Sequence, residues 1–219
     1  MKRQPPKRSF DLTSGRLCLD FVNTVDHRSS SQPDERLTGL AELLAFGEQA
    51  GVLSGSESRK RRRDGRENTR AASALFQSSV ALREMMFRIL SAVAAHHKVS
   101  KMDVEAFNAV VRRCNASCLV LPGEGKSAWQ RLDQGGDADR LIGKIVRSAV
   151  ELLTSDDIHC VKKCSADDCD WLFMDDSRSQ NRRWCEMRTC GSRQKARAYY
   201  QRKKAKRQLL VQGTAGSAG

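Results

Sequence analysis

Long apolar runs are missing from this sequence. No stretch approaches the roughly 18 consecutive apolar residues of a membrane-spanning helix, and the basic N-terminal segment MKRQPPKRSF is not followed by the apolar run of a signal peptide. We therefore expect no membrane partner and a cytoplasmic location. The hydrophobic content of 39% over 219 residues is still enough to bury a core.

The sequence also lacks the common motifs of catalytic sites. It has no glycine-rich loop to cradle a phosphate and no nucleophile elbow. Its four histidines, His27, His96, His97 and His159, form no catalytic pattern. We therefore predict that the chain is not an enzyme and has no catalytic residues.

Acidic residues are missing from one C-terminal stretch. Between Met187 and Gln208 there are nine Lys or Arg residues and no Asp or Glu, and residues 160–207 carry +8 of the net charge of +13. A helix made only for solubility usually mixes both signs of charge. The asymmetry therefore favours contact with a polyanion, above all nucleic acid.

Apolar residues recur at helical spacing through most of the first 159 positions. Five amphipathic segments are predicted to form helices: 17–25, 37–46, 75–93, 104–111 and 138–153. The last of them has a wide apolar face that would seal a core.

Two segments between these helices differ in pattern. Residues 117–121 and 127–133 flank a Pro-Gly pair and predict a short β-hairpin. Residues 54–70 have no apolar periodicity, which predicts a mobile loop. The Arg-rich stretch at 59–63 either adds a phosphate contact or is only a solvated linker, and we favour the linker.

Four of the eight cysteines form two pairs of equal spacing. Cys164 and Cys169 enclose four residues, Cys185 and Cys190 enclose four, and 15 residues separate the pairs. In a reducing cytosol such clustering indicates a metal site rather than disulfides. Four thiolates complete the tetrahedral shell of zinc, so we predict one structural Zn²⁺ ion. A ligand set in which Cys160 replaces Cys164 or Cys169 remains open.

A basic helix is expected directly after the last of these cysteines. Gly191 allows a tight turn, and residues 192–207 are good helix formers, so zinc would fix the axis of that helix. Trp171, Phe173 and Trp184 are expected to pack over the metal cage. The predicted nucleic-acid-binding residues are Arg178, Arg182, Arg183, Arg193, Lys195, Arg197, Arg202 and Lys203.

The C-terminal segment resembles the CGNR zinc finger of bacterial proteins. The signature of that finger has two cysteine pairs flanking a Phe-x-Asp-x-Ser-Arg stretch and an Arg-Arg-Trp-Cys core. The matching positions outside the cysteine pairs are Phe173, Asp175, Ser177, Arg178, Arg182, Arg183, Trp184, Met187, Gly191, Arg193 and Lys195. Ser192 stands where the family name requires Asn.

An N-terminal segment resembles a second known pattern. Residues 17–25, LCLDFVNTV, resemble the Leu-Asp-x-x-Asn-Thr opening of the ABATE domain, which precedes this finger and is described as a stress-induced transcription regulator. The resemblance implies a transcription regulator. Asp20, Asn23 and Thr24 either line a ligand pocket or hydrogen-bond the next loop, and we favour the second reading.

Together these patterns predict a mainly α (α+β) fold. We expect a helical ABATE-like domain with a short β-hairpin at 12–157, a CGNR-type zinc finger with a basic C-terminal helix at 158–207, and a disordered tail at 208–219.

The leading functional hypothesis is a zinc-dependent, DNA-binding transcription regulator whose N-terminal domain senses an effector or forms a homodimer. One alternative is an RNA-binding or ribosome-associated module, in which Tyr199, Tyr200, Trp171 and Trp184 would stack on unpaired bases. Another is a zinc finger that docks onto a protein.

Overall fold

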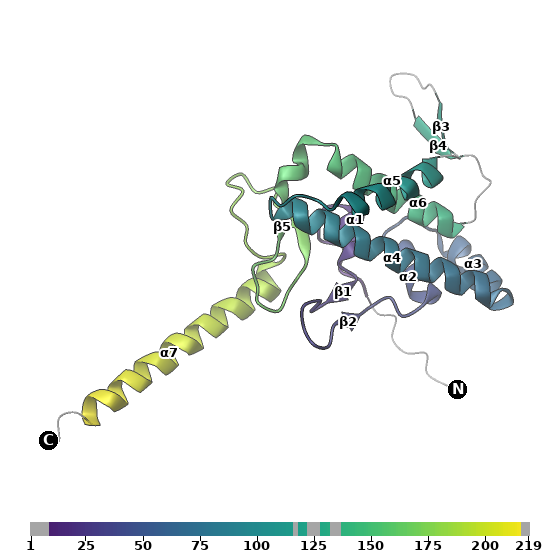
Figure 1. The fold of residues 1–219 in the computed structure, drawn as a ribbon. Helices are drawn as coiled ribbons and strands as arrows, with labels where there is room; N and C mark the ends of the chain where they lie inside the picture. Colours follow the sequence, from purple (N-terminus) through teal and green to yellow (C-terminus); the bar gives the residue numbers. More distant parts are fainter. Residues whose placement is uncertain (1–8, 116–117, 122–127, 132–136, 216–219) are drawn as a thin grey trace, which may run out of the picture.

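The fold is mainly helical, as predicted (Figure 1). The computed structural model describes residues 9–115, 118–121, 128–131 and 137–215. Its helices are α1 (Leu17–Val22), α2 (Leu40–Gln49), α3 (Gly55–Glu67), α4 (Thr69–Ala94), α5 (Lys101–Asn115), α6 (Asp137–Leu153) and α7 (Ser192–Ala215), with shorter turns η1 (Asp156–Cys160) and η2 (Met187–Gly191). Its strands are β1 (Val25–Asp26), β2 (Asp34–Glu35), β3 (Cys118–Leu121), β4 (Ala128–Arg131), β5 (Val161–Lys163) and β6 (Leu172–Met174).

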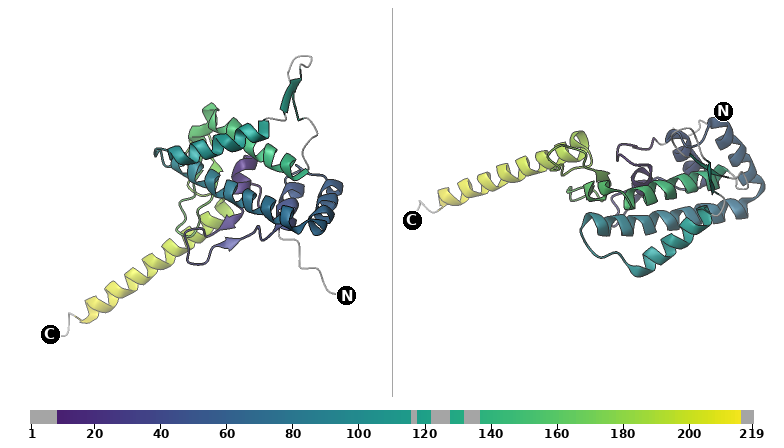
Figure 2. Two further views of the ribbon diagram at one scale, coloured as in Figure 1. Left: turned by 45° about the vertical axis from the view of Figure 1, so that its right-hand side comes forward. Right: turned by 90° about the horizontal axis from the view of Figure 1, so that it is seen from above.

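Helices α1 to α6 form one body, and α7 leaves that body at the end opposite α3 (Figures 1 and 2). The strands pair only as the antiparallel sheets β1–β2, β3–β4 and β5–β6 within the described ranges. The β3–β4 pair is the predicted hairpin, with Val120 opposite Trp129. None of the helices in the described ranges is long and apolar enough to cross a membrane.

Helix α3 corrects the prediction of a mobile loop at 54–70. The Ser54 side chain accepts a hydrogen bond from the backbone N–H of Glu57, and the Glu57 carboxylate accepts one from the N–H of Ser54. This capping box starts a helix that needs almost no apolar face, since only Ser58 of α3 is buried. The search for apolar periodicity therefore missed it.

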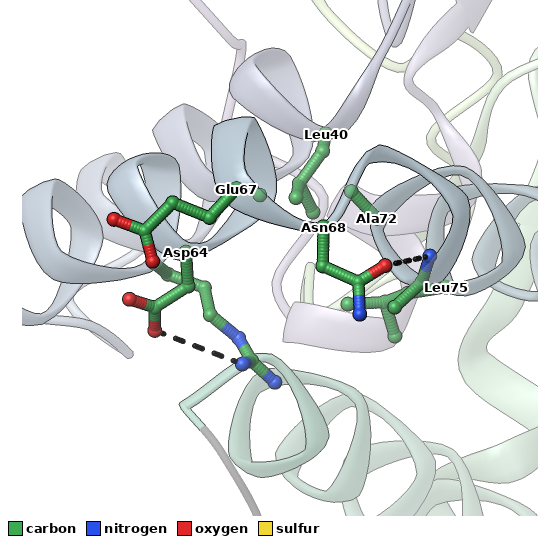
Figure 3. A pocket seen from close by; sticks show the side chains of 9 residues that line it. Leu40, Asp64, Glu67, Asn68, Ala72 and Leu75 are labelled. Atoms are coloured by element: carbon green, nitrogen blue, oxygen red, sulfur yellow. Dashed lines mark hydrogen bonds and ion pairs between the residues drawn. The ribbon is translucent and has the colours of Figure 1, made fainter.

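A pocket of about 460 Å³ lies between α3 and the first turns of α4 (Figure 3). Leu40, Ala72 and Leu75 form part of its wall. Two of its polar groups have partners: Asp64 faces Arg61, and the Asn68 side chain caps α4 by accepting a hydrogen bond from Ala71 N–H.

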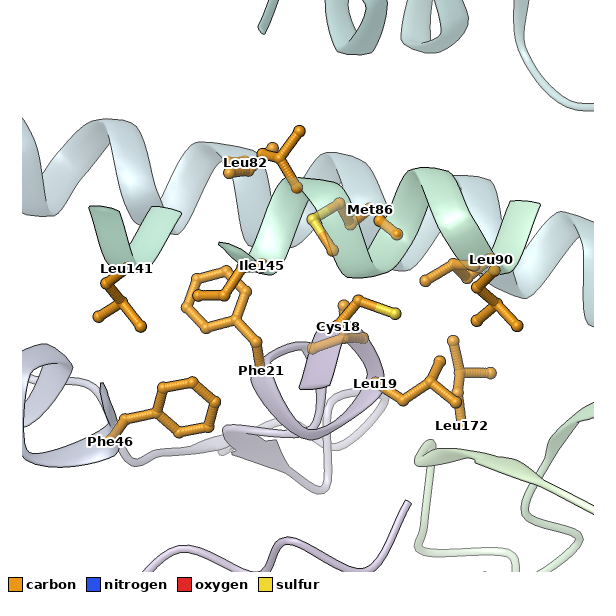
Figure 4. Packing of buried hydrophobic residues seen from close by; sticks show 14 of the residues in the cluster. Cys18, Leu19, Phe21, Phe46, Leu82, Met86, Leu90, Leu141, Ile145 and Leu172 are labelled. Carbon is orange, nitrogen blue, oxygen red and sulfur yellow. The ribbon is translucent and has the colours of Figure 1, made fainter. Parts of the chain in front are cut away.

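The hydrophobic core surrounds α1, which is short but almost wholly buried. Cys18, Leu19, Phe21 and Val22 are each 0% exposed and pack between α4 and α6 (Figure 4). Burial raises the pKa of the Cys18 thiol to about 11, so this cysteine is an unreactive core residue. Leu172 of β6 belongs to the same core (Figure 4). One strand of the C-terminal module is thus part of the N-terminal core.

The C-terminal tail is shorter than predicted. Helix α7 continues to Ala215, so residues 208–215 are helical rather than disordered. The sequence QLLVQ at 208–212 contains no glycine or proline that would end the helix. Residues 216–219 lie outside the described residues.

Candidate zinc centre and nucleic-acid interface

The four paired cysteines come from two loops that β5, β6 and η2 hold in place. Cys164 follows β5 directly, and its N–H donates to the carbonyl of Trp171 just before β6 (2.8 Å). Cys169 N–H closes a turn onto the carbonyl of Ala166. Cys185 precedes η2, and Cys190 lies within it. The short β-ribbon therefore brings the first pair to the second.

The sulfur positions fit a tetrahedral zinc ion. All four Sγ atoms lie within 4.8 Å of one another. The separation is 3.8 Å between Cys169 and Cys185 and 3.6 Å between Cys185 and Cys190. Four sulfurs about 2.3 Å from a central zinc would lie about 3.8 Å apart, whereas a disulfide needs about 2.05 Å. The cluster is a site for one structural zinc ion with no open coordination position.

Cys160 is outside this cluster. The candidate ligands that lie together are Cys164, Cys169, Cys185 and Cys190. The Cys160 sulfur instead accepts a hydrogen bond from the side chain of Gln180 (3.4 Å). The geometry thus settles the ligand set in favour of the two equally spaced pairs.

N–H donors reach two sulfurs of the cluster. The backbone N–H of Cys185 donates to the Cys164 sulfur (3.4 Å). Contacts among the thiols lower the pKa of Cys164 and raise the pKa of Cys169 and Cys185. The guanidinium of Arg193 also donates to the Cys190 sulfur (3.3 Å). Donors of this kind favour the thiolate form, which is the form that zinc binds.

Gly191 makes close contacts at the start of α7. A Cβ atom at this position would lie 2.6 Å from the Met187 sulfur and 3.4 Å from the Trp184 ring. Its N–H donates to the carbonyl of Glu186, five residues earlier, which gives η2 its wide turn. The predicted tight turn is this widened helical turn, which carries Cys190 into the cluster.

Aromatic residues pack over the cysteines as predicted. Trp171 is 8% exposed and Phe173 is 1% exposed, and both belong to a small cluster with the zinc ligands. Trp184 packs against this cluster and is half-buried. Trp171 is therefore unavailable for stacking on a nucleic-acid base.

Asp175 organises the loop that follows β6. Its carboxylate is buried and accepts hydrogen bonds from Lys162 Nζ (2.6 Å), the Ser177 hydroxyl (2.5 Å) and the N–H of Arg182 (2.9 Å). Burial alone raises the pKa of Asp175, but these donors outweigh it and lower the pKa to about 2. Asp175 and Ser177 of the finger signature are thus structural residues.

Replacement of Asp175 with alanine is expected to lower the free energy of unfolding by about 3 kcal/mol, because three donors lose a charged acceptor. Since the folded pKa lies below 3.8, the stabilisation is present above about pH 4 and is lost as the pH falls towards 2. Urea unfolding at neutral pH measures the loss. The neighbouring Asp176 is exposed, so Asp176→Ala is the matched control and should change stability by less than about 0.5 kcal/mol. Equal effects of the two variants would contradict this role of Asp175.

Arg182, predicted to bind nucleic acid, is engaged inside the finger. Its guanidinium donates to the carbonyls of Trp184 (3.0 Å) and Cys185 and lies 4.7 Å from the centre of the Phe173 ring. It therefore closes the loop between the two cysteine pairs. Sequence spacing alone gives no signal for such backbone contacts.

The N-terminal domain holds the free edge of β6. On one edge of this strand, Asp175 N–H donates to the carbonyl of Cys160. On the other edge, Met174 N–H donates to the carbonyl of Ser14, and the Asn23 side chain both accepts from Leu172 N–H (3.0 Å) and donates to Leu172 O (2.8 Å). Ser14 and Asn23 thus replace a third strand.

Asp20, Asn23 and Thr24 form hydrogen bonds within the fold, but their side-chain partners lie in the preceding segment, α1, α4 and β6 rather than in the next loop, which was the favoured prediction. The Asp20 carboxylate accepts from Ser14 N–H (3.0 Å), and burial raises the pKa of Asp20. The Thr24 hydroxyl donates to the carbonyl of Phe21 and accepts from the buried Arg83. These residues support the contact between the N-terminal domain and the finger.

Asp168 joins the finger, α7 and the N-terminal domain. Its carboxylate pairs with Arg193 (3.0 Å) and Arg197 (2.9 Å), and its carbonyl accepts from His27 Nδ1 (2.6 Å). Burial raises the pKa of Asp168, but the two guanidinium groups outweigh this and hold it below its usual range. These two arginines, also predicted to bind nucleic acid, thus fix the direction in which α7 leaves the finger.

The remaining predicted contact residues lie at the surface. Arg178 and Arg183 on the finger loop and Lys195, Arg202 and Lys203 on α7 are all exposed. Among the described residues, none of the five forms an ion pair with a carboxylate. They are among the positive charges that the finger and α7 leave available to a partner.

Comparison with known families gives two matches. Residues 15–156 match the ABATE family, described as “Putative stress-induced transcription regulator”, and residues 161–203 match the CGNR zinc finger. A comparison with curated proteins finds no match. Both resemblances inferred from the sequence are thus confirmed.

Proposed function

The chain belongs to the ABATE family and carries a CGNR zinc finger, and on that premise we propose that it is a DNA-binding transcription regulator. One zinc ion fixes the basic helix α7, and that helix contacts the phosphate backbone. In this proposal zinc has a structural and not a catalytic role, because four thiolates leave it no position for a substrate or a reactive water.

The exposure of α7 is the observation that carries this proposal. Every side chain from Lys195 to Ala205 is exposed, and no acidic residue occurs between Met187 and Gln208. The helix projects from the body (Figures 1 and 2). A helix with charge of one sign and no buried face gains little stability from packing against the rest of the protein. A polyanion is the partner that this surface suits.

The exposed charges set the expected salt dependence. Arg178, Arg183, Lys195, Arg202 and Lys203 supply about five phosphate contacts, so log affinity should fall with log salt at a slope of about −4.5 on duplex DNA. Phosphate contacts position a protein but do not specify sequence. The slope therefore tests the interface without a known operator.

Replacement of Lys195, Arg202 and Lys203 with glutamine is expected to reduce the slope to about −1.8, because about two phosphate contacts remain. Glutamine keeps the helix propensity of α7. The matched control replaces three exposed cations elsewhere, Lys98, Arg112 and Arg113, and should keep the wild-type slope. Anisotropy titrations of a labelled duplex at several salt concentrations measure both. Equal slopes for the two variants would reject α7 as the contact surface.

Single-stranded nucleic acid is the second candidate partner. Tyr199 and Tyr200 on α7 are 56% and 68% exposed, and their rings lie 5.7 Å apart at 73°. Exposed aromatic rings can stack on unpaired bases. Competition between duplex and single-stranded probes of equal length separates the two candidates. A preference for the single strand that is lost in Tyr199→Ala/Tyr200→Ala would favour this second function.

A further inference from the structure

Helix α3 carries a second concentration of positive charge. At 3.6 residues per turn, Arg59, Arg62, Arg63 and Arg66 fall within an arc of about 100° on one side of the helix. Arg59, Arg63 and Arg66 are exposed. Arg62 is half-buried and donates to the carbonyl of Ala41 on α2 (3.3 Å). We call these four arginines the α3 basic face.

Two of the three acidic residues of α3 have partners away from this face: Glu57 pairs with Arg140 and caps the N-terminus of the helix, and Asp64 faces Arg61. The third, Glu67, follows Arg63 by four residues and lies beside the face. In the part of the chain that the structure describes, neither Arg59, Arg63 nor Arg66 takes part in an ion pair. Helix α3 thus has six basic and three acidic residues, and four of the basic residues lie on this face, which carries an excess of positive charge.

The α3 basic face and α7 lie at opposite ends of the molecule. In Figures 1 and 2, α3 lies at the end of the helical body that is remote from the zinc finger. Helix α7 points away from the helical body. A polyanion held along α7 therefore leaves the α3 basic face open to another segment.

We propose that the α3 basic face binds the phosphate backbone of a second duplex DNA segment, so that one chain bridges two segments. This inference rests on the proposed function, because it assumes that α7 holds the first segment. Arginine suits phosphate through its planar fork of donors.

The composition of α3 argues against other polyanionic partners. The sequence GSESRKRRRDGRE has no large apolar side chain that could enter a bilayer or anchor a protein interface. Backbone phosphates need no such anchor, because counterion release supplies most of the affinity. The second partner is therefore a nucleic-acid backbone rather than a membrane or an acidic protein.

The test is a bridging assay with the full, zinc-loaded chain. A short duplex is fixed to beads, protein is added, and capture of a second, fluorescent duplex is measured at low salt. The variant replaces Arg59, Arg63 and Arg66 with glutamine, and the control replaces Lys98, Arg112 and Arg113 with glutamine, so both lose the same charge. Circular dichroism checks that each variant remains helical.

We expect wild type and control to capture the second duplex. The α3 variant should bind the first duplex with little change but lose capture by about tenfold or more, because about three phosphate contacts are removed. Capture by the α3 variant at the control level would overturn the proposal, since bridging would then come from another surface or from a dimer. Binding of one duplex without capture by wild type would overturn it as well and leave the function of α7 intact.

Two further results would also reject it. Failure of the wild type to bind any duplex would reject both the function of α7 and this inference. Binding to anionic phosphatidylglycerol vesicles that depends on the three arginines, in the absence of capture, would assign the α3 basic face to a membrane surface instead.

Discussion

Cys185→Ser is expected to abolish zinc binding and unfold the finger. Cys185 lies 3.8 Å from the Cys169 sulfur and 3.6 Å from the Cys190 sulfur, so its loss opens the tetrahedron. The finger has only a small aromatic cluster of its own. Zinc binding supplies about 10 kcal/mol or more to the folding of such modules. No packing within the finger can replace it.

The loss should spread beyond the finger because β6 belongs to the main core. Leu172 and Met174 are buried among the N-terminal helices. We expect the variant to keep most of its helical circular dichroism but to melt at a lower temperature, with Trp171 and Trp184 fluorescence shifted towards that of exposed tryptophan. The zinc content of the purified protein should fall from one ion per chain to almost none.

Cys160→Ser is the matched control for Cys185→Ser. Cys160 is buried nearby, but its sulfur accepts a hydrogen bond from Gln180 and lies outside the cluster. This variant should keep one zinc ion per chain. Loss of zinc from Cys160→Ser, or full zinc in Cys185→Ser, would contradict the ligand set.

Asn23→Ala is expected to separate the finger from the helical domain. The substitution removes both hydrogen bonds to the Leu172 backbone and the one to the Ser14 hydroxyl (2.7 Å). It leaves a buried N–H and a buried carbonyl without partners, at a cost of about 3 kcal/mol. For a chain of this size that corresponds to a fall in melting temperature of about 6 to 12 °C.

The same variant should keep its zinc at saturating metal, because Asn23 contacts none of the cysteines. Asn108→Ala is the matched control, since Asn108 is exposed on α5, and should melt within about 2 °C of wild type. Limited proteolysis around residues 155–160 is expected to be faster in Asn23→Ala only. Equal melting temperatures for the two variants would mean that Asn23 does not hold β6.

The zinc ligands and most helices follow from local patterns in the sequence. Two equally spaced cysteine pairs predict the site, and apolar stripes predict α4, α5 and α6. The sequence could not decide between Cys160 and its neighbours, because that choice depends on which sulfurs β5 and β6 bring together. Spacing limits the ligand set, and three-dimensional geometry completes it.

Helix α3 shows where periodicity fails as a signal. Its only buried side chain is Ser58, so there is no apolar stripe to find. The pair Ser54 and Glu57 was the available signal, because a Ser followed three residues later by Glu marks a helix start. The charge on this segment was visible in the sequence, but only a helix gathers four arginines on one side.

Long-range contacts account for the remaining differences. Asn23 and Leu172 are 149 positions apart, and nothing local pairs them. In the sequence, Arg182 is one more cation in a basic segment. In the structure, its guanidinium donates hydrogen bonds to backbone carbonyls. A basic residue near zinc ligands is therefore not by itself a nucleic-acid contact.

One measurement decides most directly whether zinc positions α7 for DNA. Binding of a labelled duplex to the wild-type chain is titrated at several salt concentrations, with zinc loaded and after removal by a chelator. We expect the loaded protein to bind with a log–log slope of about −4.5 and the stripped protein to bind far more weakly, with full recovery when zinc returns. Two results would contradict the claim that zinc positions α7 for DNA: absence of duplex binding by the fully zinc-loaded protein at low salt, or binding that is unchanged by the chelator.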